Sequence, residues 1–428
     1  MRGPQFPCRK ASDSRPPSSR VIRLAVLLLV LALSAAGALE IRDSWLSPSA
    51  IQAQETTLQK SAPPPSPPET DRKKIGEEVQ INPDGYTSAR VCGRCHVDIY
   101  NSWKNSMHAF SLADPIFDVA YMQALKEAGD TARRLCLRCH APLTMANGDY
   151  DLRLGVTNEG VSCDFCHTVT DVQLENPQRP YVLKPGLVKR SVLRNAASPK
   201  HDVAYSALHA KSEFCGACHN YIAPNGTPVM TTYDEWRNGP YPAEGIQCQN
   251  CHMVLSAGKV VTQDIKESGP EIHLHDLIHD TNQLRGALDV EIVEAVRRER
   301  ELRVTVVVKN VGSGHMVPTG IPSREIHLIV TVEVGGHTLR QDRRYRKVLA
   351  DKNNRHLERD HEALLYAAQV VSDNRIAPRE KRFERFTFSV PKSGKLNLDA
   401  TLTYIYSPLL LQQKRMNIKL DHAAKSGL

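Results

Sequence analysis

Five copies of one short cysteine motif constrain the fold of this chain more than any other feature of its sequence. All but one of the 11 cysteines fall between residues 91 and 252, each in a Cys-x-x-Cys pair with a histidine directly behind it. The five motifs are Cys92/Cys95/His96, Cys136/Cys139/His140, Cys163/Cys166/His167, Cys215/Cys218/His219 and Cys248/Cys251/His252. Their separations along the chain are irregular, which predicts a repeated chemical motif rather than a repeated fold unit.

The spacing within each motif has a chemical reason. On a helical turn, residues i, i+3 and i+4 share one face, so two thiols can bond the vinyl groups of one porphyrin. The histidine then lies under the iron as its proximal axial ligand. Zinc sites, redox dithiols and disulfides also use paired cysteines, but none of them requires a histidine after every pair. Five complete copies therefore predict five covalently bound haem c groups, which also account for an aromatic content of only 6%.

The second axial ligand of each iron decides between electron transfer and chemistry at iron. A histidine on both sides closes the iron, whereas an empty sixth position lets it bind a small molecule. The distal ligands that we expect, each with a surface or structural histidine as the alternative, are His108, His201, His209, His275 and His315. His275 lies in "EIHLHDLIHD", where a zinc-binding cluster is a further alternative. His315 lies in a glycine-rich loop that could closely approach a flat macrocycle.

The first 38 residues have the pattern of an export signal. Basic residues precede an apolar run, and Ala36-Gly37-Ala38 fits a small-x-small cleavage site. An uncleaved anchor formed by residues 21–39 is the alternative. Residues 39–85 contain "SAPPPSPPETDRKK", which predicts a Pro-rich disordered linker. Without the first 38 residues the formal charge falls from +8 to about +3, which is too little to indicate nucleic-acid binding.

The chain changes character after about residue 285. The segments "ELRVTVVVKNV" and "EIHLIVTVEV" alternate apolar and polar side chains with a period of two, and later segments repeat the pattern. Several such segments predict an immunoglobulin-like β-sandwich over residues 286–412, interrupted by a charged, helical insertion, "ADKNNRHLERDHEALLYAAQ", and followed by a tail at 413–428. The fold class that we expect is therefore a mainly α multihaem cytochrome domain with little regular structure, over residues 86–285, followed by this all-β domain.

Four stretches of the chain resemble the multihaem cytochrome c family typified by the tetrahaem cytochrome c-554. They are "CGRCHVDIYNSWKNSMHAF", "GVSCDFCH", "SALHAKSEFCGACHN" and "TYDEWRNGPYPAEGIQCQNCHM", and the loop "NVGSGHMVPTG" resembles part of a β domain in some multihaem relatives. The resemblance covers roughly residues 90–285. It implies closely stacked haems, electron transfer outside the cytoplasm, and His108 and His209 as distal ligands. One haem of that relative is five-coordinate; the fifth motif and the β domain of this chain depart from it.

These features predict an exported pentahaem cytochrome that carries electrons along a stacked haem array between redox partner proteins, rather than an enzyme. One alternative is a reductase or oxidase of a small nitrogen or sulfur compound at one open iron. Another is a haem-bearing structural subunit that assembles through its β domain. We expect a periplasmic or cell-surface location, with membrane association through the N-terminal segment as the alternative to free export.

Overall fold

The computed structural model describes residues 79–261, 271–277, 281–411 and 415–428. The expected export signal, and the expected linker up to residue 78, lie outside these residues. The described residues all belong to a single unit of the chain. None of the helices in these ranges is both long enough and apolar enough to cross a membrane.

Short helices joined by loops make up the first part of the described chain. They are α2 (Ala89–Cys92), α3 (Val97–Trp103), α4 (Pro115–His140), α5 (Thr144–Asn147), α6 (Cys163–Thr168), α7 (Glu213–Gly216), α8 (Thr232–Arg237), α9 (Cys248–His252) and α10 (Thr281–Ala287). Between them lie small two-stranded sheets: β1 (Val169–Val172) with β2 (Tyr181–Leu183), β3 (Val188–Ser191) with β4 (Asp202–Tyr205), β5 (Tyr221–Ile222) with β6 (Pro228–Met230), and β7 (Leu255–Ala257) with β8 (Glu271–His273). Regular structure is therefore sparse here, and the small sheets were not predicted.

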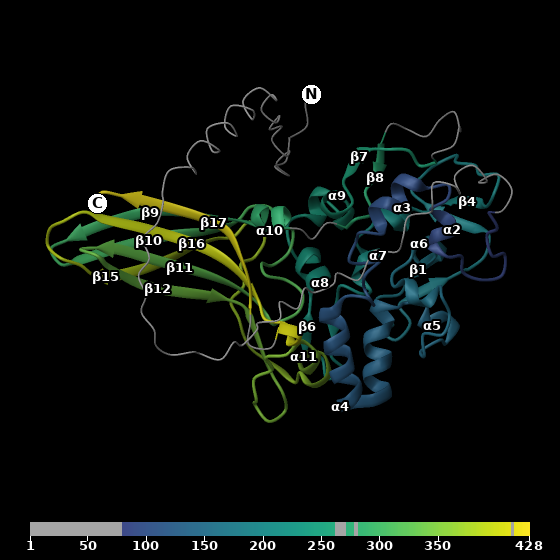
Figure 1. Cartoon of the computed structure of the whole chain (residues 1–428), viewed down its shortest axis with the longest axis horizontal. Coiled ribbons are helices and arrows are strands. Elements are labelled where there is room, and N and C mark those ends of the chain that lie inside the picture. Colours follow the sequence, from purple (N-terminus) through teal and green to yellow (C-terminus); the bar gives the residue numbers. More distant parts are fainter. Residues whose placement is uncertain (1–78, 262–270, 278–280, 412–414) are drawn as a thin grey trace, which may run out of the picture. The chain divides into compact units, whose positions relative to one another are not determined.

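The longest helix, α4, consists of two helices that meet at Gly129. Asp114 caps its start by accepting a hydrogen bond from the backbone N–H of Ile116 at 3.0 Å. Gly129 has a φ of 53° and a ψ of −127°, a conformation that side chains with a Cβ rarely adopt, so the chain can reverse there. The two halves lie side by side (Figure 1), and Phe117 near the start stacks on His140 at the end.

Long strands follow in two antiparallel sheets. The first sheet has the order β15-β10-β9 and consists of β9 (Leu288–Arg298), β10 (Glu301–Asn310) and β15 (Lys381–Ser389). The second has the order β12-β11-β16-β17 and consists of β11 (Arg324–Val334), β12 (His337–Tyr345), β16 (Leu396–Tyr406) and β17 (Met416–Ser426). The predicted period-two alternation is confirmed, because Leu302, Val304 and Val306 of β10 are all buried.

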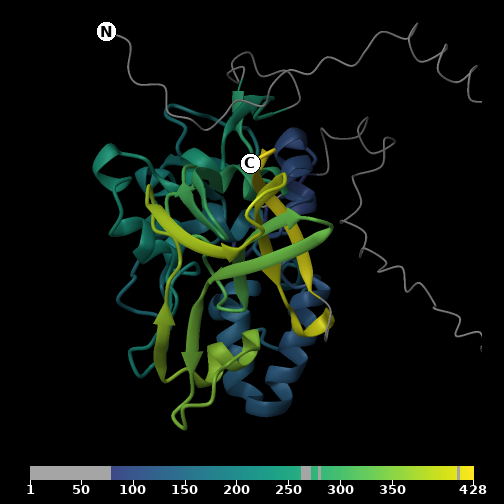
Figure 2. The same cartoon turned by 90° about the vertical axis from the view of Figure 1, so that its left-hand side faces the viewer.

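The buried faces of both sheets contribute to one hydrophobic core. Val304 of β10, Leu328 of β11, Phe386 of β15 and Leu402 of β16 all belong to it. Burying each such side chain stabilises the fold by about 1.5–3 kcal/mol. The strands can be followed together in Figure 1, and Figure 2 turns them toward the viewer. This region therefore has a core of side chains alone.

Residues 413–428 are not the tail that we expected, because they supply β17. This strand pairs with β16 from Asn397↔Ser426 to Tyr406↔Met416. Met416, Ile418 and Leu420 follow the two-residue period in "MNIKLDHAAKS", but His422 and Ala424 continue it without a large apolar side chain, so the pattern was too weak to predict a strand. The charged insertion does contain a helix, α11 (Asp360–Tyr366), between the paired strands β13 (Lys347–Ala350) and β14 (Gln369–Asp373).

The insertion packs against the helical region. The hydroxyl of Tyr221 donates to the carbonyl oxygen of Leu364 at 3.0 Å. Nε2 of His361 lies 3.2 Å from a carboxylate oxygen of Glu127 on α4. Tyr221 also belongs to a buried apolar cluster that includes Leu349 of β13. Buried contacts therefore fix the insertion on the helices that carry the cysteine motifs.

Candidate haem-binding sites

Each cysteine motif includes a helical turn. Cys163 begins α6 and Cys248 begins α9, whereas His140 ends α4. In the first and fourth motifs the backbone N–H of the histidine donates to the carbonyl of the first cysteine, at 3.0 Å for both His96 and His219. This i to i+4 bond is that of an α-helix, so both cysteines and the histidine share one face. The local geometry therefore fits attachment of one porphyrin to a motif.

The fifth motif lies wholly within α9, so both of its cysteines belong to one short helix. Cys248 begins the helix, and its sulfur forms a hydrogen bond with that of Cys215 in the fourth motif. Cys251, the second cysteine that we expect to bond this haem, is half-buried and forms no disulfide. It follows Cys248 by three residues, so it shares one face of the helix with Cys248. The helix therefore presents Cys251 suitably, but a thioether bond at Cys251 stays a prediction.

Backbone carbonyls orient three of the proximal histidines. The Nδ1 atoms of His96, His140 and His167 lie 2.6, 2.8 and 2.6 Å from carbonyl oxygens, those of Val260, Ser111 and Arg190. An Nδ1–H that donates to a carbonyl leaves the lone pair of Nε2 for a metal, as in most metal-binding histidines. The three imidazoles are thus oriented for ligation before any cofactor is considered.

Four pairs of histidines have the separation of two ligands on one iron. Each pair joins a proximal histidine to a predicted distal one, and the ring centroids lie 6.1 Å apart for His96–His201, 6.2 Å for His219–His108, 6.3 Å for His167–His275 and 6.5 Å for His252–His315. A metal–nitrogen bond is about 2 Å long, so two imidazoles on one metal have centres about 6 Å apart. These four motifs therefore fit an iron held between two histidines.

The third motif has two predicted distal histidines near it. The ring of His209 lies 5.8 Å from that of His167, close to the 6.3 Å of His275. However, Nδ1 of His209 lies 2.9 Å from the hydroxyl of Ser206, and its Nε2 lies 3.0 Å from the carbonyl oxygen of Cys166. Nδ1 of His275 lies 2.8 Å from the carbonyl oxygen of His273, which leaves Nε2 for a metal. The geometry favours His275.

The second motif differs from the other four. None of the histidine pairs found among the described residues includes its proximal ligand, His140. Instead the ring of Phe117 stacks face to face on His140, with centroids 3.8 Å apart and planes at 13°. A phenyl ring can orient the imidazole but cannot bind a metal. This contact was not predicted, because Phe117 comes close to His140 only through the reversal at Gly129.

Burial keeps these histidines neutral, which is the form that binds a metal. It lowers the pKa of His108 to about 3, and nearby histidines add to the effect. It also lowers the pKa of His140 and of His275 to about 4. Burial likewise holds the pKa of His167 and of His315 below the usual value. No proton therefore has to be removed from these imidazoles before they bind a metal at neutral pH.

Contacts between cysteine sulfurs show which motifs are neighbours. The first motif contacts the third, the fourth contacts the fifth, and the second contacts the fourth; the hydrogen-bonded pairs are Cys92–Cys163, Cys215–Cys248 and Cys139–Cys218. Cys166 also lies near Cys215, so the third motif neighbours the fourth. In a haem-bearing protein these atoms are thioether sulfurs at porphyrin edges. Each macrocycle would therefore have another beside it.

The first and fourth motifs lie in two copies of one local structure. A Cβ added at Gly93 would lie 2.5 Å from the ring of Tyr100, and one at Gly216 would lie 2.8 Å from that of Tyr233. Each tyrosine packs on the tryptophan three residues later, with ring centroids 5.7 Å apart in both copies. The expectation of a repeated motif without a repeated fold unit is therefore wrong for these two segments.

The described residues also enclose a large cavity near the first motif. Its volume is about 1520 Å³, and its lining includes Ala89, Tyr100, Trp103, Phe110 and Glu159 but no cysteine or histidine of the motifs. Cavities for ordinary small ligands are about 300–1,000 Å³. The buried hydroxyl of Tyr100 has no hydrogen-bond partner among the described residues. In the same part of the chain, no three histidine, cysteine or acidic side chains are grouped to hold a bare metal ion, and the ten cysteines form no disulfide.

Part of the chain matches a known protein family, and the fold is similar to that of a solved structure. Residues 91–168 match the family model described as "Cytochrome c554 and c-prime". The structure is similar to that of a penta-heme cytochrome c552 from Thermochromatium tepidum, with a TM-score of 0.64, 21% identity, and coverage of 79% of this chain and 98% of that one. A CARDB domain from Pyrococcus furiosus also matches, covering 33% of this chain and 83% of that one, with a TM-score of 0.17 and 14% identity. No curated protein matches.

The family model covers the first three of the five motifs and ends at residue 168, so the fourth motif and the fifth, with Cys251, lie outside it. The structural likeness to the penta-heme cytochrome extends over 79% of this chain. Together with the helical Cys-x-x-Cys-His turns, these findings support a multihaem c-type cytochrome with covalently bound haem and a role in electron transfer.

Proposed function

We propose that this protein is a pentahaem electron carrier. The observation that carries the proposal is the set of four histidine pairs with ring centroids 6.1–6.5 Å apart. An iron with an imidazole on each side has no open position, which suits electron transfer rather than binding of a substrate. Haem c supplies the one-electron carrier at each motif, and the chain supplies attachment, axial ligands and spacing.

The ligand scheme follows from the pairs. His96, His140, His167, His219 and His252 are the proximal ligands, bound beside the ten motif cysteines. The distal ligands are His201 for the first motif, His275 for the third, His108 for the fourth and His315 for the fifth. We assign no ligand role to His209, because its Nε2 lies 3.0 Å from the carbonyl oxygen of Cys166, whereas Nε2 of His315 has only a longer contact, 3.4 Å to the hydroxyl of Ser313.

The sulfur contacts support a connected array rather than isolated centres. The order is first, third, fourth and fifth motif, with the second attached to the fourth. Such an order would give the array three ends, at the first, second and fifth motifs, where partners could exchange electrons. His315 comes from the loop between β10 and β11. The strand region, for which we propose an immunoglobulin-like sandwich, would therefore complete the fifth site.

A second function is favoured by one observation, the lack of a histidine partner for His140 among the described residues. If that iron has an open position, it could bind a small nitrogen or sulfur compound and receive electrons from the fourth motif. The apolar ring of Phe117 would then hold the proximal imidazole in place without closing the iron. On this reading the protein is a reductase or oxidase whose other four haems deliver or remove electrons.

We also propose export to the periplasm or cell surface, with residues 1–38 as a signal or as a membrane anchor. The partners would be redox proteins, and assembly through the strand region is a further candidate role. Nucleic acid is not among the expected partners.

The ligand scheme is tested with two substitutions in the haem-loaded protein. His275→Ala should convert one low-spin haem to high spin in the optical and electron paramagnetic resonance spectra, whereas His209→Ala should leave both spectra as in the wild type. Covalent haem content, measured by mass spectrometry, should stay at five in both. The reverse spectral result would transfer the ligand role to His209, and fewer than five haems would contradict the pentahaem proposal. Reduction of nitrite or hydroxylamine by the dye-reduced protein would support the second function.

A further inference from the structure

Two short helices in different parts of the chain share a four-residue pattern. α3 ends with "YNSW", Tyr100 to Trp103, and α8 contains "YDEW", Tyr233 to Trp236. In both helices the tyrosine packs against the glycine of the preceding Cys-Gly-x-Cys motif. The third and fourth residues of each pattern make contacts of a different kind.

The tryptophans anchor the start of a later motif. Nε1–H of Trp103 donates to the carbonyl of Val161 at 2.9 Å, and Nε1–H of Trp236 donates to the carbonyl of Ile246 at 3.0 Å. Val161 lies two residues before Cys163, and Ile246 lies two residues before Cys248. Each tryptophan therefore fixes the helical turn that presents a proximal histidine, His167 in one copy and His252 in the other.

The residue before each tryptophan anchors the opposite side of the same site. The hydroxyl of Ser102 accepts a hydrogen bond from the backbone N–H of His275 at 2.7 Å. The carboxylate of Glu235 accepts one from the backbone N–H of Met316, the residue after His315, at 3.3 Å. Ser102 and Glu235 occupy equivalent positions in the two patterns, and each therefore holds the segment that carries a distal histidine.

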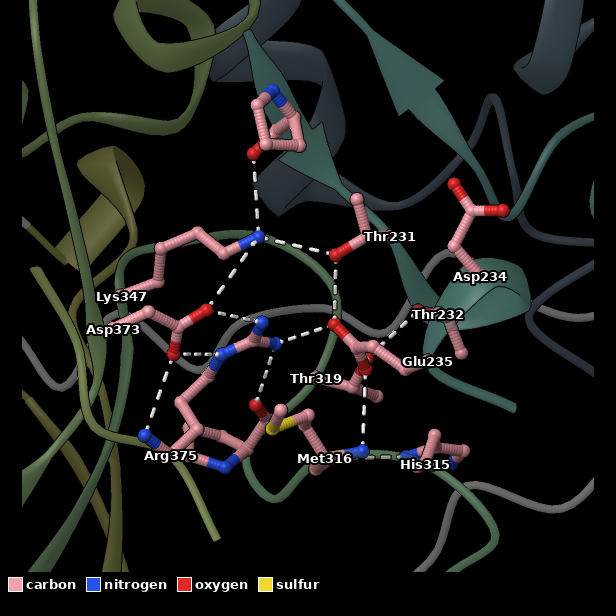
Figure 3. A network of polar contacts seen from close by, with 12 residues as sticks. Thr231, Thr232, Asp234, Glu235, His315, Met316, Thr319, Lys347, Asp373 and Arg375 are labelled. Atoms are coloured by element: carbon pink, nitrogen blue, oxygen red, sulfur yellow. Dashed lines mark hydrogen bonds and ion pairs between the residues drawn. The ribbon is translucent and has the colours of Figure 1, made fainter. Parts of the chain in front are cut away.

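In the second copy the anchor is charged and strongly held (Figure 3). Besides Met316, Glu235 accepts a hydrogen bond from the hydroxyl of Thr319 at 2.6 Å, which fixes the far end of the His315 loop. Arg375 neutralises Glu235 through an ion pair of 2.6 Å, in which both side chains are only 5% exposed. The hydroxyl of Thr231 donates at 2.8 Å to the carboxylate oxygen that Arg375 also bonds, whereas Met316 and Thr319 donate to the other one. The carboxylate therefore has a single well-defined position from which to hold the loop.

We propose that α3 and α8 are positioning helices that set the distance between the two axial histidines of the third and fifth haems. The tryptophan fixes the proximal side, and Ser102 or Glu235 fixes the distal side, so one rigid turn connects both ligands of one iron. This inference rests on the proposed ligand scheme. It assigns Ser102 and Glu235 as positioning residues. Each holds the backbone at or beside a distal histidine, and neither bonds the imidazole ring.

The consequence of losing the anchor follows from where the distal histidines lie. His315 belongs to a loop between strands, and His275 follows β8 in a segment without regular structure. Without a hydrogen bond to the helix, such segments sample more conformations, and the imidazole spends less time at binding distance. The iron would then be high-spin for part of the time and open to an added ligand.

The test compares matched substitutions in the haem-loaded full chain. Ser102→Ala and Glu235→Ala remove the anchors, and Asn101→Ala and Arg237→Ala change a neighbouring residue of the same helices that makes neither anchor contact. The readouts are haem content, the high-spin fraction in the electron paramagnetic resonance spectrum, and the change on adding imidazole. We expect five haems in every variant, with up to one iron in five becoming high-spin in each anchor variant and returning to low spin with imidazole. Both control variants should keep the wild-type spectrum.

Two further substitutions separate failure of this inference from failure of the ligand scheme. If His275→Ala and His315→Ala each open one iron while the anchor variants keep the wild-type spectrum, the positioning role is wrong and the ligand scheme stands. If His275→Ala and His315→Ala change nothing, the ligand scheme is wrong and the inference falls with it. Glu235→Ala leaves a buried arginine unpaired; if it does not fold, Ser102→Ala, which removes a single hydroxyl, decides the question.

Discussion

The ion pair between Arg375 and Glu235 should be among the most costly to break in the described part of the chain. Arg375→Met keeps the length of the side chain but removes its charge and its hydrogen-bond donors. Nη1 of Arg375 bonds Glu235 at 2.6 Å and the carbonyl of Pro318 at 3.2 Å, and Nη2 bonds Asp373 at 2.7 Å. The substitution would leave the carboxylate of Glu235, which is 5% exposed, buried without its partner.

The size of the effect can be worked out from these contacts. Removing one member of a buried ion pair typically costs about 3–5 kcal/mol. Thr231, Met316 and Thr319 would still donate hydrogen bonds to Glu235, which places the expected loss at the lower end, about 3 kcal/mol.

The assay is urea unfolding of the haem-loaded protein, followed by far-ultraviolet circular dichroism. Arg379→Met is the matched control, because Arg379 pairs with Glu244 at the surface, where the two side chains are 43% and 29% exposed. Water already solvates that pair, so its loss should have little effect. Equal destabilisation by both substitutions would refute the argument from burial, as would no destabilisation by Arg375→Met.

Two further predictions concern the strand region. Phe386→Ala should cost about 3–5 kcal/mol of unfolding free energy, because Phe386 is 2% exposed in the core. Phe383→Ala on the same strand should cost far less, because Phe383 is 57% exposed. Comparable losses of the two variants in chemical denaturation would contradict this. Burial alone would raise the pKa of Glu325, but hydrogen bonds with His327 and Arg346 lower it to about 2. The stability contributed by Glu325 is therefore present above its unfolded pKa and is lost as pH falls from about 4.5 to 2. Over that range the unfolding free energy of Glu325→Gln should fall by about 1–2 kcal/mol less than that of the wild type. Parallel pH profiles of the two proteins would count against this.

Local patterns predicted the chemistry of the cysteine motifs because everything they require lies within five residues. A helical turn needs no distant contact to bring Cys163, Cys166 and His167 to one face. The strands of the first sheet were predictable for a related reason, since the alternation in β10 depends only on one buried face. Where the information is local, the sequence sufficed.

The distal side of each site depends on long-range contacts, and there the sequence was less informative. His275 is fixed by Ser102, which lies 173 residues away in the chain. The family resemblance implied His209 rather than His275, and the hydrogen bonds of the two ring nitrogens of His209 are what separate the two histidines. Nothing local indicates that Phe117 would stack on His140, because a single reversal at Gly129 brings them together.

The repeated Tyr-x-x-Trp helices were hidden for a related reason. α3 anchors the third motif, and α4, with the second motif, lies between the two in the chain. α8 anchors the fifth motif, and only a short segment separates them. Irregular spacing of the motifs therefore did not mean irregular structure. α4 also carries the second motif, the one whose proximal histidine has no histidine partner among the described residues.

The ligand scheme is tested most directly by one measurement, spin quantification in the low-temperature electron paramagnetic resonance spectrum of the oxidised, haem-loaded protein, recorded with and without cyanide. The four histidine pairs predict low-spin signals for four irons per chain that cyanide leaves unchanged. His140, which has no histidine partner among the described residues, predicts one high-spin iron per chain, whose signal cyanide converts to low spin. Two or more irons per chain that respond to cyanide would contradict the assignment of the four pairs as axial ligands.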